Sequence, residues 1–222
     1  MRNKAALHLK WARRVCPIWS LFFRAFFGAR ARAMRNLPSS GAFILAPNHQ
    51  SFFDGQLLGC PLDRPIFFMV SAPYFKIPVI GPFLNAVGCI PIGGGGGQEA
   101  YRAGLEVLEE GYCLAVFPEG HRSRDGSLLN LQLGAARMAH LTGAPIVPVS
   151  VVGAFEAWPR NRMLPRPFRP ITVKYHRQIP CPVVPKDQLR VESRRTTEKL
   201  GRVLRRRLAA WEVVRRRVSG GG

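Results

Sequence analysis

Short apolar runs alternate with helical segments along most of the chain. Runs at residues 41–46, 66–70, 87–92, 112–117 and 146–152 are bounded by Gly and Pro, and they predict buried strands. Helices are expected at 54–58, 98–110 and 131–141, and a sixth strand at 171–176 precedes a helix at 187–217. Strands that alternate with helices predict an α/β fold, with a central mixed sheet flanked by helices.

The two ends of the chain carry most of its charge. The formal net charge is +20, from 33 basic and 13 acidic residues. Residues 1–35 have nine basic side chains and no acidic one, residues 186–217 have a net charge of +8, and residues 36–185 have only +3. We therefore expect a membrane-association segment at 1–35, the main domain at 36–185, and a basic helix within 186–222 that packs on this domain and ends in a flexible tail. A balance this basic predicts an anionic partner.

The N-terminal segment interleaves aromatic residues with arginines, a composition typical of an amphipathic helix lying in a membrane interface. The alternative is a core helix with a solvated basic face. The best apolar stretch, residues 15–29, is interrupted by Arg24 and is shorter than a membrane span requires. Basic residues follow it and no cleavage site is evident, which argues against a signal peptide. We expect a peripheral or monotopic protein at the cytoplasmic face of the cell membrane, in contact with anionic lipids.

The cysteines predict neither a disulfide framework nor a metal site. There are five of them, they are scattered, and no Cys-x-x-Cys pair occurs. A reducing compartment is the simpler interpretation.

A first candidate site directly follows the strand at 41–46. Here His49 and Asp54 lie five residues apart across a strand-to-helix turn and can meet. A neutral imidazole can take a proton from an attacking hydroxyl, while a carboxylate on its other nitrogen fixes the tautomer and stabilises the imidazolium. The same residues allow another interpretation, because Ser51 and Asp54 have the spacing of a helix capping box.

A second candidate site follows the strand at 112–117. Residues 117–123 read Phe-Pro-Glu-Gly-His-Arg-Ser, which places Glu119, Gly120 and Arg122 where strands of α/β sheets bind ligands. An arginine offers a planar fork to phosphate, and glycine allows a close approach to the backbone. The alternative is an ordinary turn with a surface ion pair.

Together the two segments resemble the glycerolipid acyltransferase family, the 1-acylglycerol-3-phosphate acyltransferases. The first motif of the family is matched by Asn48, His49, Ser51 and Asp54, its third by the segment 117–123, and its fourth, a Val-Pro-Val block, within 143–149. The likeness extends over residues 41–152. It implies that His49 is the general base, that Asp54 orients it, and that the substrate site includes Glu119, Gly120, Arg122 and Ser123.

The resemblance also implies the reaction. A fatty acyl group moves from a coenzyme A or acyl-carrier-protein thioester to a lipid hydroxyl, foremost 1-acylglycerol-3-phosphate, in phospholipid synthesis. The thioester is a cosubstrate, and no metal or redox cofactor is expected.

Several positions depart from the pattern of the family. Gly93 stands where the second motif has an arginine for the acceptor phosphate, His121 replaces a Thr, and Gln132 and Ala72 stand where lysines are common. An acceptor phosphate needs compensating charge, so an ornithine lipid, another lysophospholipid or a glycolipid is an alternative acceptor. Arg102 and Arg124 are possible substitutes.

Two further alternatives lie outside the enzyme class. One is a basic nucleic-acid-binding module, which the isoelectric point of 11.3 would fit. The near-neutral segment 36–185 has no nucleic-acid motif, so no nucleic acid is expected as a partner. The other alternative is a scaffold that kept the fold without turnover.

Overall fold

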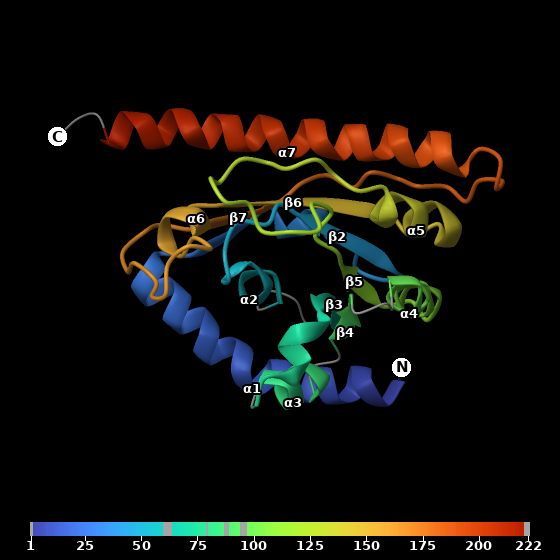
Figure 1. Cartoon of the computed structure of the whole chain (residues 1–222), viewed down its shortest axis with the longest axis horizontal. Coiled ribbons are helices and arrows are strands. Elements are labelled where there is room, and N and C mark those ends of the chain that lie inside the picture. The colour runs from blue at the N-terminus through green and yellow to red at the C-terminus, as the bar shows by residue number, and fades with distance from the viewer. Residues whose placement is uncertain (1, 60–63, 79, 87–88, 94–96, 220–222) are drawn as a thin grey trace.

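The computed structural model describes residues 2–59, 64–78, 80–86, 89–93 and 97–219, and it has the predicted α/β architecture (Figure 1). In the described residues the sheet has seven strands in the order β1-β7-β6-β2-β5-β3-β4. The strands are β1 (Arg30–Arg32), β2 (Phe43–Pro47), β3 (Ile66–Ser71), β4 (Ile90–Ile92), β5 (Cys113–Ala115), β6 (Ile146–Val152) and β7 (Thr172–Tyr175). The main helices are α1 (Arg2–Phe27), α2 (Asp54–Gly59), α3 (Ile80–Ala86), α4 (Gly97–Glu109), α5 (Gly134–Thr142), α6 (Ala154–Ala157) and α7 (Leu189–Ser219).

The sheet is mixed, as predicted. β2 pairs in parallel with both β5 and β6, β3 is parallel to β5 and β4, and β1 is parallel to β7. Only the described pair β6 and β7 is antiparallel. The carboxyl ends of β2, β5 and β6 therefore lie at one edge of the sheet.

Helices cover both faces of the sheet, because the central strands are apolar on both sides. Along β2, Ile44 and Ala46 belong to a core that includes residues of α4, α5 and α7. Phe43 and Leu45 point to the opposite face, where they join the second core with Phe23 and Phe27 of α1 and with residues of α2 and α6. Figure 1 shows the same arrangement, with α7 on one side of the sheet and α1 and α2 on the other. This layering leaves the strand ends free to carry a site.

Three of the described strands and α-helices were not predicted. β1 reads Arg-Ala-Arg and all three residues are exposed, so it has no apolar pattern. Helices α3 and α6 are short, with seven and four residues. The strand predicted at 87–92 is present at Ile90–Ile92, while residues 87 and 88 lie outside the described ranges, as does the expected flexible end at 220–222.

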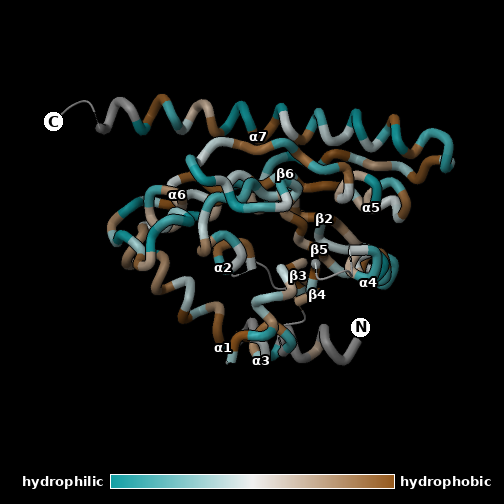
Figure 2. Tube along the Cα trace, in the orientation of Figure 1, coloured by the Kyte–Doolittle hydropathy of each residue, from teal (hydrophilic) through white to brown (hydrophobic). Residues whose placement is uncertain are grey.

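The two long terminal helices differ in how they pack. Figure 2 shows a largely hydrophilic α7 with apolar residues at intervals, and Leu200 and Leu204 of this helix are buried in the core. In the C-terminal half of α1, Phe23 and Phe27 are buried against Phe53, whereas Ile18 and Leu21 are each 70% exposed. This half of α1 is therefore apolar on a buried side and on a solvent-facing side. None of the described helices is long and apolar enough to cross a bilayer.

Candidate functional site

The two motif segments meet at one edge of the sheet because they follow neighbouring parallel strands. Two backbone contacts join them directly. The amide of His49 donates to Oε1 of Glu119 at 2.6 Å, and the amide of Ser123 donates to the carbonyl oxygen of His49 at 2.8 Å. The segment after β2 and the segment after β5 therefore form a single structural unit.

His49 and Asp54 lie in direct contact. Nδ1 of His49 is 2.8 Å from Oδ2 of Asp54, and the His49 side chain is 21% exposed whereas Asp54 is fully buried. Because Nδ1 faces a carboxylate, it is the nitrogen that carries the proton in the neutral ring, and Nε2 is left as the acceptor. Within the described part of the chain Nε2 has no hydrogen-bond partner. This is the arrangement that a general base requires.

The capping interpretation of Asp54 also describes the structure. Oδ2 accepts the amides of Gln50 at 2.7 Å and Ser51 at 2.8 Å, and the Ser51 hydroxyl accepts the amide of Phe53 at 3.2 Å. These bonds resemble a capping box at the start of α2, except that Ser51 accepts the amide of Phe53 and not that of Asp54. One carboxylate oxygen thus serves the turn and the imidazole, so the two interpretations are not exclusive.

Asn48 fixes the same turn to the neighbouring strand. Its side-chain Nδ2 donates to the carbonyl oxygen of Val151 at 2.9 Å, and the amide of Val151 donates to its Oδ1 at 2.7 Å. The side chain therefore continues the ladder between β2 and β6 past the last residue of β2. This holds the backbone of the adjacent His49 in place.

Glu119 is buried at 3% exposure, and each of its carboxylate oxygens accepts a backbone amide. Oε1 accepts from His49 and Oε2 accepts from Leu129, the latter at 2.7 Å. Burial raises the pKa of Glu119 to about 7, and the two amide bonds and the charge of Asp54 modify this shift to a smaller extent. The geometry gives Glu119 a positioning role, and contact with a substrate stays a prediction.

Arg122 has a partly enclosed guanidinium group. Its Cζ lies 3.5 Å from the ring centroid of Phe52, and Nη2 donates to the hydroxyl of Tyr74 at 3.2 Å. Nη1 is buried and has no hydrogen-bond partner among the described residues. A guanidinium group that lies over an aromatic ring and has an unpaired donor is suited to an anionic ligand.

The remaining predicted residues shape the loop. Gly120 has φ +73°, in the left-handed region that favours glycine, and its amide donates to the carbonyl oxygen of Phe117 at 3.1 Å. Ser123 is buried, and its hydroxyl donates to Asp125 and accepts the amide of Gly126, each at 3.0 Å. A substrate contact of Gly120 or Ser123 remains a prediction.

Four neighbours of this unit were not predicted from the sequence. The ring of Phe117 stacks on His49 with centroids 4.0 Å apart, Phe52 and Tyr74 hold Arg122, and the carbonyl oxygen of Trp158 accepts the Ser51 hydroxyl at 2.9 Å. Phe52 and Phe117 lie inside the quoted motifs, so their positions were a usable signal. No sequence pattern marked Tyr74 or Trp158.

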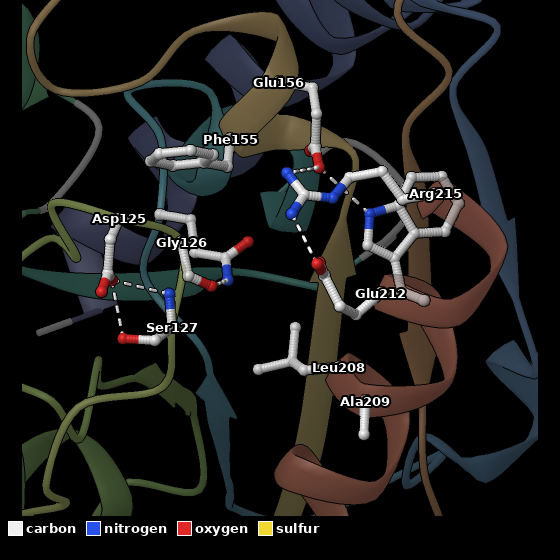
Figure 3. A pocket seen from close by; sticks show the side chains of 11 residues that line it. Asp125, Gly126, Ser127, Phe155, Glu156, Leu208, Ala209, Glu212 and Arg215 are labelled. Carbon is white, nitrogen blue, oxygen red and sulfur yellow. Dashed lines mark hydrogen bonds and ion pairs between the residues drawn. The ribbon is translucent and has the colours of Figure 1, made fainter. Parts of the chain in front are cut away.

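A cavity of about 330 Å³ lies between the loop 125–127, α6 and α7 (Figure 3). It is lined by Gln50, the loop 125–127, α6 and the C-terminal part of α7. Within it, Arg215 is paired with Glu212 at 2.7 Å and with Glu156 at 3.7 Å. No predicted site residue lines this cavity, so we do not place the chemistry there.

Comparison with known proteins identifies the class: the chain belongs to the Acyltransferase family, whose model matches residues 29–152. This confirms the resemblance drawn from the motifs. A chloroplastic 1-acyl-sn-glycerol-3-phosphate acyltransferase of Brassica napus is 31% identical over 150 residues, which cover 65% of this chain and 43% of that protein. The 1-acyl-sn-glycerol-3-phosphate acyltransferase of Bacillus subtilis is 28% identical over 128 residues, covering 57% of this chain and 63% of that one.

The fold has a counterpart among solved structures. The crystal structure of the 1-acyl-sn-glycerophosphate acyltransferase PlsC from Thermotoga maritima superposes with a TM-score of 0.71 at 23% identity, over 92% of this chain and 78% of that one. At this identity the likeness shows the fold alone. The chain spans less than half the length of the plant relatives that it matches.

Proposed function

We propose that this protein is a membrane-associated O-acyltransferase that transfers a fatty acyl group from an acyl thioester to a lipid hydroxyl. The observation that carries the proposal is the 2.8 Å contact of His49 Nδ1 with the buried carboxylate of Asp54, with the imidazole partly exposed at the sheet edge. Membership of the Acyltransferase family and the printed names of the relatives support it.

The reaction needs one proton relay. The acceptor hydroxyl gives its proton to Nε2 of His49 as its oxygen attacks the carbonyl carbon of the thioester. The tetrahedral intermediate then expels the thiolate, which takes the proton from the imidazolium, so the ester and the free thiol are the products. Asp54 keeps Nδ1 protonated and stabilises the transient imidazolium charge. General base catalysis of this kind contributes about 10²- to 10⁴-fold in rate.

The acceptor that we propose first is 1-acylglycerol-3-phosphate. The free Nη1 donor of Arg122 supports an anionic acceptor, and the relatives carry the name of this activity. Gly93 stands at the position where the family has an arginine for the acceptor phosphate. The assay therefore also includes the other lipid hydroxyls as acceptors. The acyl donor is a coenzyme A or acyl-carrier-protein thioester.

Membrane association is proposed from α1. Its exposed side chains Ile18 and Leu21 lie on a helix with a strongly basic composition and no acidic residue. Such a helix can lie in the headgroup region with apolar groups inward and arginines at anionic lipids. We propose that the protein is peripheral or monotopic, at the cytoplasmic face of the cell membrane.

The test compares purified wild-type protein with His49→Ala and Asp54→Ala. Transfer from labelled acyl-coenzyme A and acyl-carrier protein is measured with 1-acylglycerol-3-phosphate and with a panel of non-phosphate lipid hydroxyls. We expect both variants to lose transfer and to keep the α/β circular dichroism spectrum, whereas Asp187→Ala, an exposed acid ahead of α7, keeps wild-type rates. Transfer retained by either variant would refute the relay, and a preference for a panel lipid would replace the proposed acceptor.

A further inference from the structure

The connection between α6 and β7 has an unusual surface. Residues 159–170 read Pro-Arg-Asn-Arg-Met-Leu-Pro-Arg-Pro-Phe-Arg-Pro, with four arginines and no acid. This 159–170 loop has the three most exposed large apolar side chains of the described residues: Met163 at 93%, Leu164 at 76% and Phe168 at 75%. Single exposed apolar residues are common on proteins, but three within six positions form a patch.

The backbone of the loop is held in a defined shape, so this exposure is not that of a loose segment. The amide of Arg166 donates to the carbonyl oxygen of Ala157 at 2.7 Å, and the indole of Trp158 donates to the carbonyl oxygen of Arg162 at 3.0 Å. Phe168 has φ +59°, a left-handed conformation that costs a bulky residue about 1–3 kcal/mol. Its amide donates to the carbonyl oxygen of Phe26 at 2.6 Å. The strained residue is thus fixed to the end of α1 while its ring faces solvent.

The loop lies beside the end of α1, which also exposes apolar residues. Phe26, whose carbonyl oxygen holds the loop, is itself 47% exposed, and Ile18 and Leu21 are exposed on the preceding turns of the same helix. Helix α3 contacts α1 and exposes Ile80 and Phe83 at 42% and 44%. Figure 1 shows the loop beside the C-terminal end of α1 and α3 next to a more N-terminal part of it. The exposed apolar residues of three separate segments therefore lie along one helix.

We propose that the 159–170 loop is a second membrane-inserting element, which buries Met163, Leu164 and Phe168 in an anionic bilayer while its arginines bind the head groups. The proposal rests on the membrane association proposed above and adds to it a place of contact outside α1. Charge complementarity selects the occupant: Arg160, Arg162, Arg166 and Arg169 flank the apolar residues, all four are exposed, and the loop has no acid. Exposed apolar side chains flanked by guanidinium groups match a bilayer that has an apolar interior and anionic head groups.

The loop is also connected to the candidate site. Trp158, at its base, accepts the Ser51 hydroxyl with its carbonyl oxygen, and its ring lies 5.0 Å from Phe52 and 4.9 Å from Phe53 between centroids. Phe52 in turn carries the Arg122 guanidinium. Insertion of the loop together with α1 would therefore fix the orientation of the His49 edge relative to the lipid surface, which a single helix could not do.

The test measures sedimentation of the full chain with vesicles of phosphatidylcholine containing about 30% phosphatidylglycerol, which supplies the anionic surface. The loop variant combines Met163→Ser, Leu164→Ser and Phe168→Ser. The matched control combines Val191→Thr, Val213→Thr and Val214→Thr, three exposed apolar residues of α7. Because burial of one large apolar side chain is worth roughly a tenfold change in partitioning, we expect the loop variant to bind at least about tenfold more weakly. The control should bind like wild type.

A second variant tests the arginines. Replacement of all four by Gln should weaken binding to anionic vesicles by about fivefold for each arginine that contacts the head groups, with no change on neutral vesicles. Thermal unfolding of both variants at the wild-type temperature would show that the losses are not caused by misfolding.

The outcomes separate this inference from the proposed function. If the wild-type protein binds vesicles and the loop variant binds them equally well, the loop assignment is wrong. The acyltransferase proposal is not affected by this outcome. Absence of vesicle binding by wild type would overturn the membrane association and the loop assignment together. If the loop variant binds vesicles normally but no longer binds a soluble acidic protein that wild type binds, the partner of the loop is a protein and the lipid assignment is wrong.

Discussion

The substitution Asp54→Asn separates two functions that one carboxylate performs. Oδ2 of Asp54 accepts three hydrogen bonds, from the amides of Gln50 and Ser51 and from Nδ1 of His49, at 2.7 to 2.8 Å. Oδ1 is buried without a partner among the described residues. An asparagine can place its oxygen at the position of Oδ2 and its amide nitrogen at that of Oδ1. The turn then keeps its acceptor, but His49 loses the negative charge beside it.

The two effects have different sizes. A hydrogen bond to a charged group contributes about 1.5–3 kcal/mol and a neutral one about 0.5–1.5 kcal/mol, so three bonds could lose about 3 kcal/mol. The neutral amide avoids the cost of burying a charge, and this offsets part of the loss. We therefore expect the free energy of unfolding to fall by about 1–3 kcal/mol. The rate falls further, by up to the full contribution of the general base, about 10²- to 10⁴-fold.

The assay is kcat at saturating thioester and acceptor, together with urea unfolding of the same preparations. Asp125→Asn is the matched control, because Oδ1 of Asp125 also accepts three hydrogen bonds, from Ser123 and twice from Ser127, without touching His49. We expect this control to lose stability and to keep most of its kcat. If Asp54→Asn kept kcat within about tenfold of wild type, the carboxylate would not be needed to support the imidazole and the relay would be wrong.

Two further substitutions test the surroundings of the relay. Arg122→Lys keeps the charge but loses the planar fork on Phe52, so we expect the KM for 1-acylglycerol-3-phosphate to rise by about tenfold, as lost charged hydrogen bonds imply; an unchanged KM would place the acceptor phosphate elsewhere. Glu119→Gln should change how stability depends on pH. Burial raises the pKa of Glu119 from 4.5 to about 7, so between these two pH values the folded state binds more protons than the unfolded state. The free energy of unfolding therefore falls as pH rises through this range, by on the order of 3 kcal/mol. Urea unfolding at pH 5, 6 and 7 should show a smaller such decline for Glu119→Gln than for wild type, and parallel profiles would contradict the assignment.

The central strands could be predicted because a strand that is buried on both faces has consecutive apolar residues, as in β2 and β6. β1 could not, since its three exposed residues become a strand only through pairing with β7 about 140 positions later in the chain. Short helices such as α6 offer too few turns for a periodic pattern. Local patterning therefore identifies the centre of the sheet better than its edge.

The site divides in the same way. The spacing of His49 and Asp54 allowed their contact, because both lie within one turn, but it also fitted a capping box at Ser51 and Asp54, and the second motif was needed to favour the contact. The amide bonds of Glu119 could not be predicted, because one of them depends on the backbone of His49, 70 residues earlier; its predicted contact with a substrate stays a prediction. The support that Tyr74 gives to Arg122 likewise depends on tertiary packing.

The reversal of a single strand has a geometric consequence for the whole molecule. Because β7 runs against β6, the chain turns back at the edge where β6 ends and does not cross to the far side of the sheet. β1 follows β7 in direction, and Arg30 is paired with Thr172 at the start of that strand, so the chain leaving α1 enters the sheet at this same edge. In a fully parallel sheet both β7 and β1 would begin at the opposite end, so the α6–β7 connection would have to cross the sheet and α1 would have to enter it there. One antiparallel pairing thus brings the α6–β7 connection and the chain leaving α1 to the same end of the sheet as the imidazole of His49.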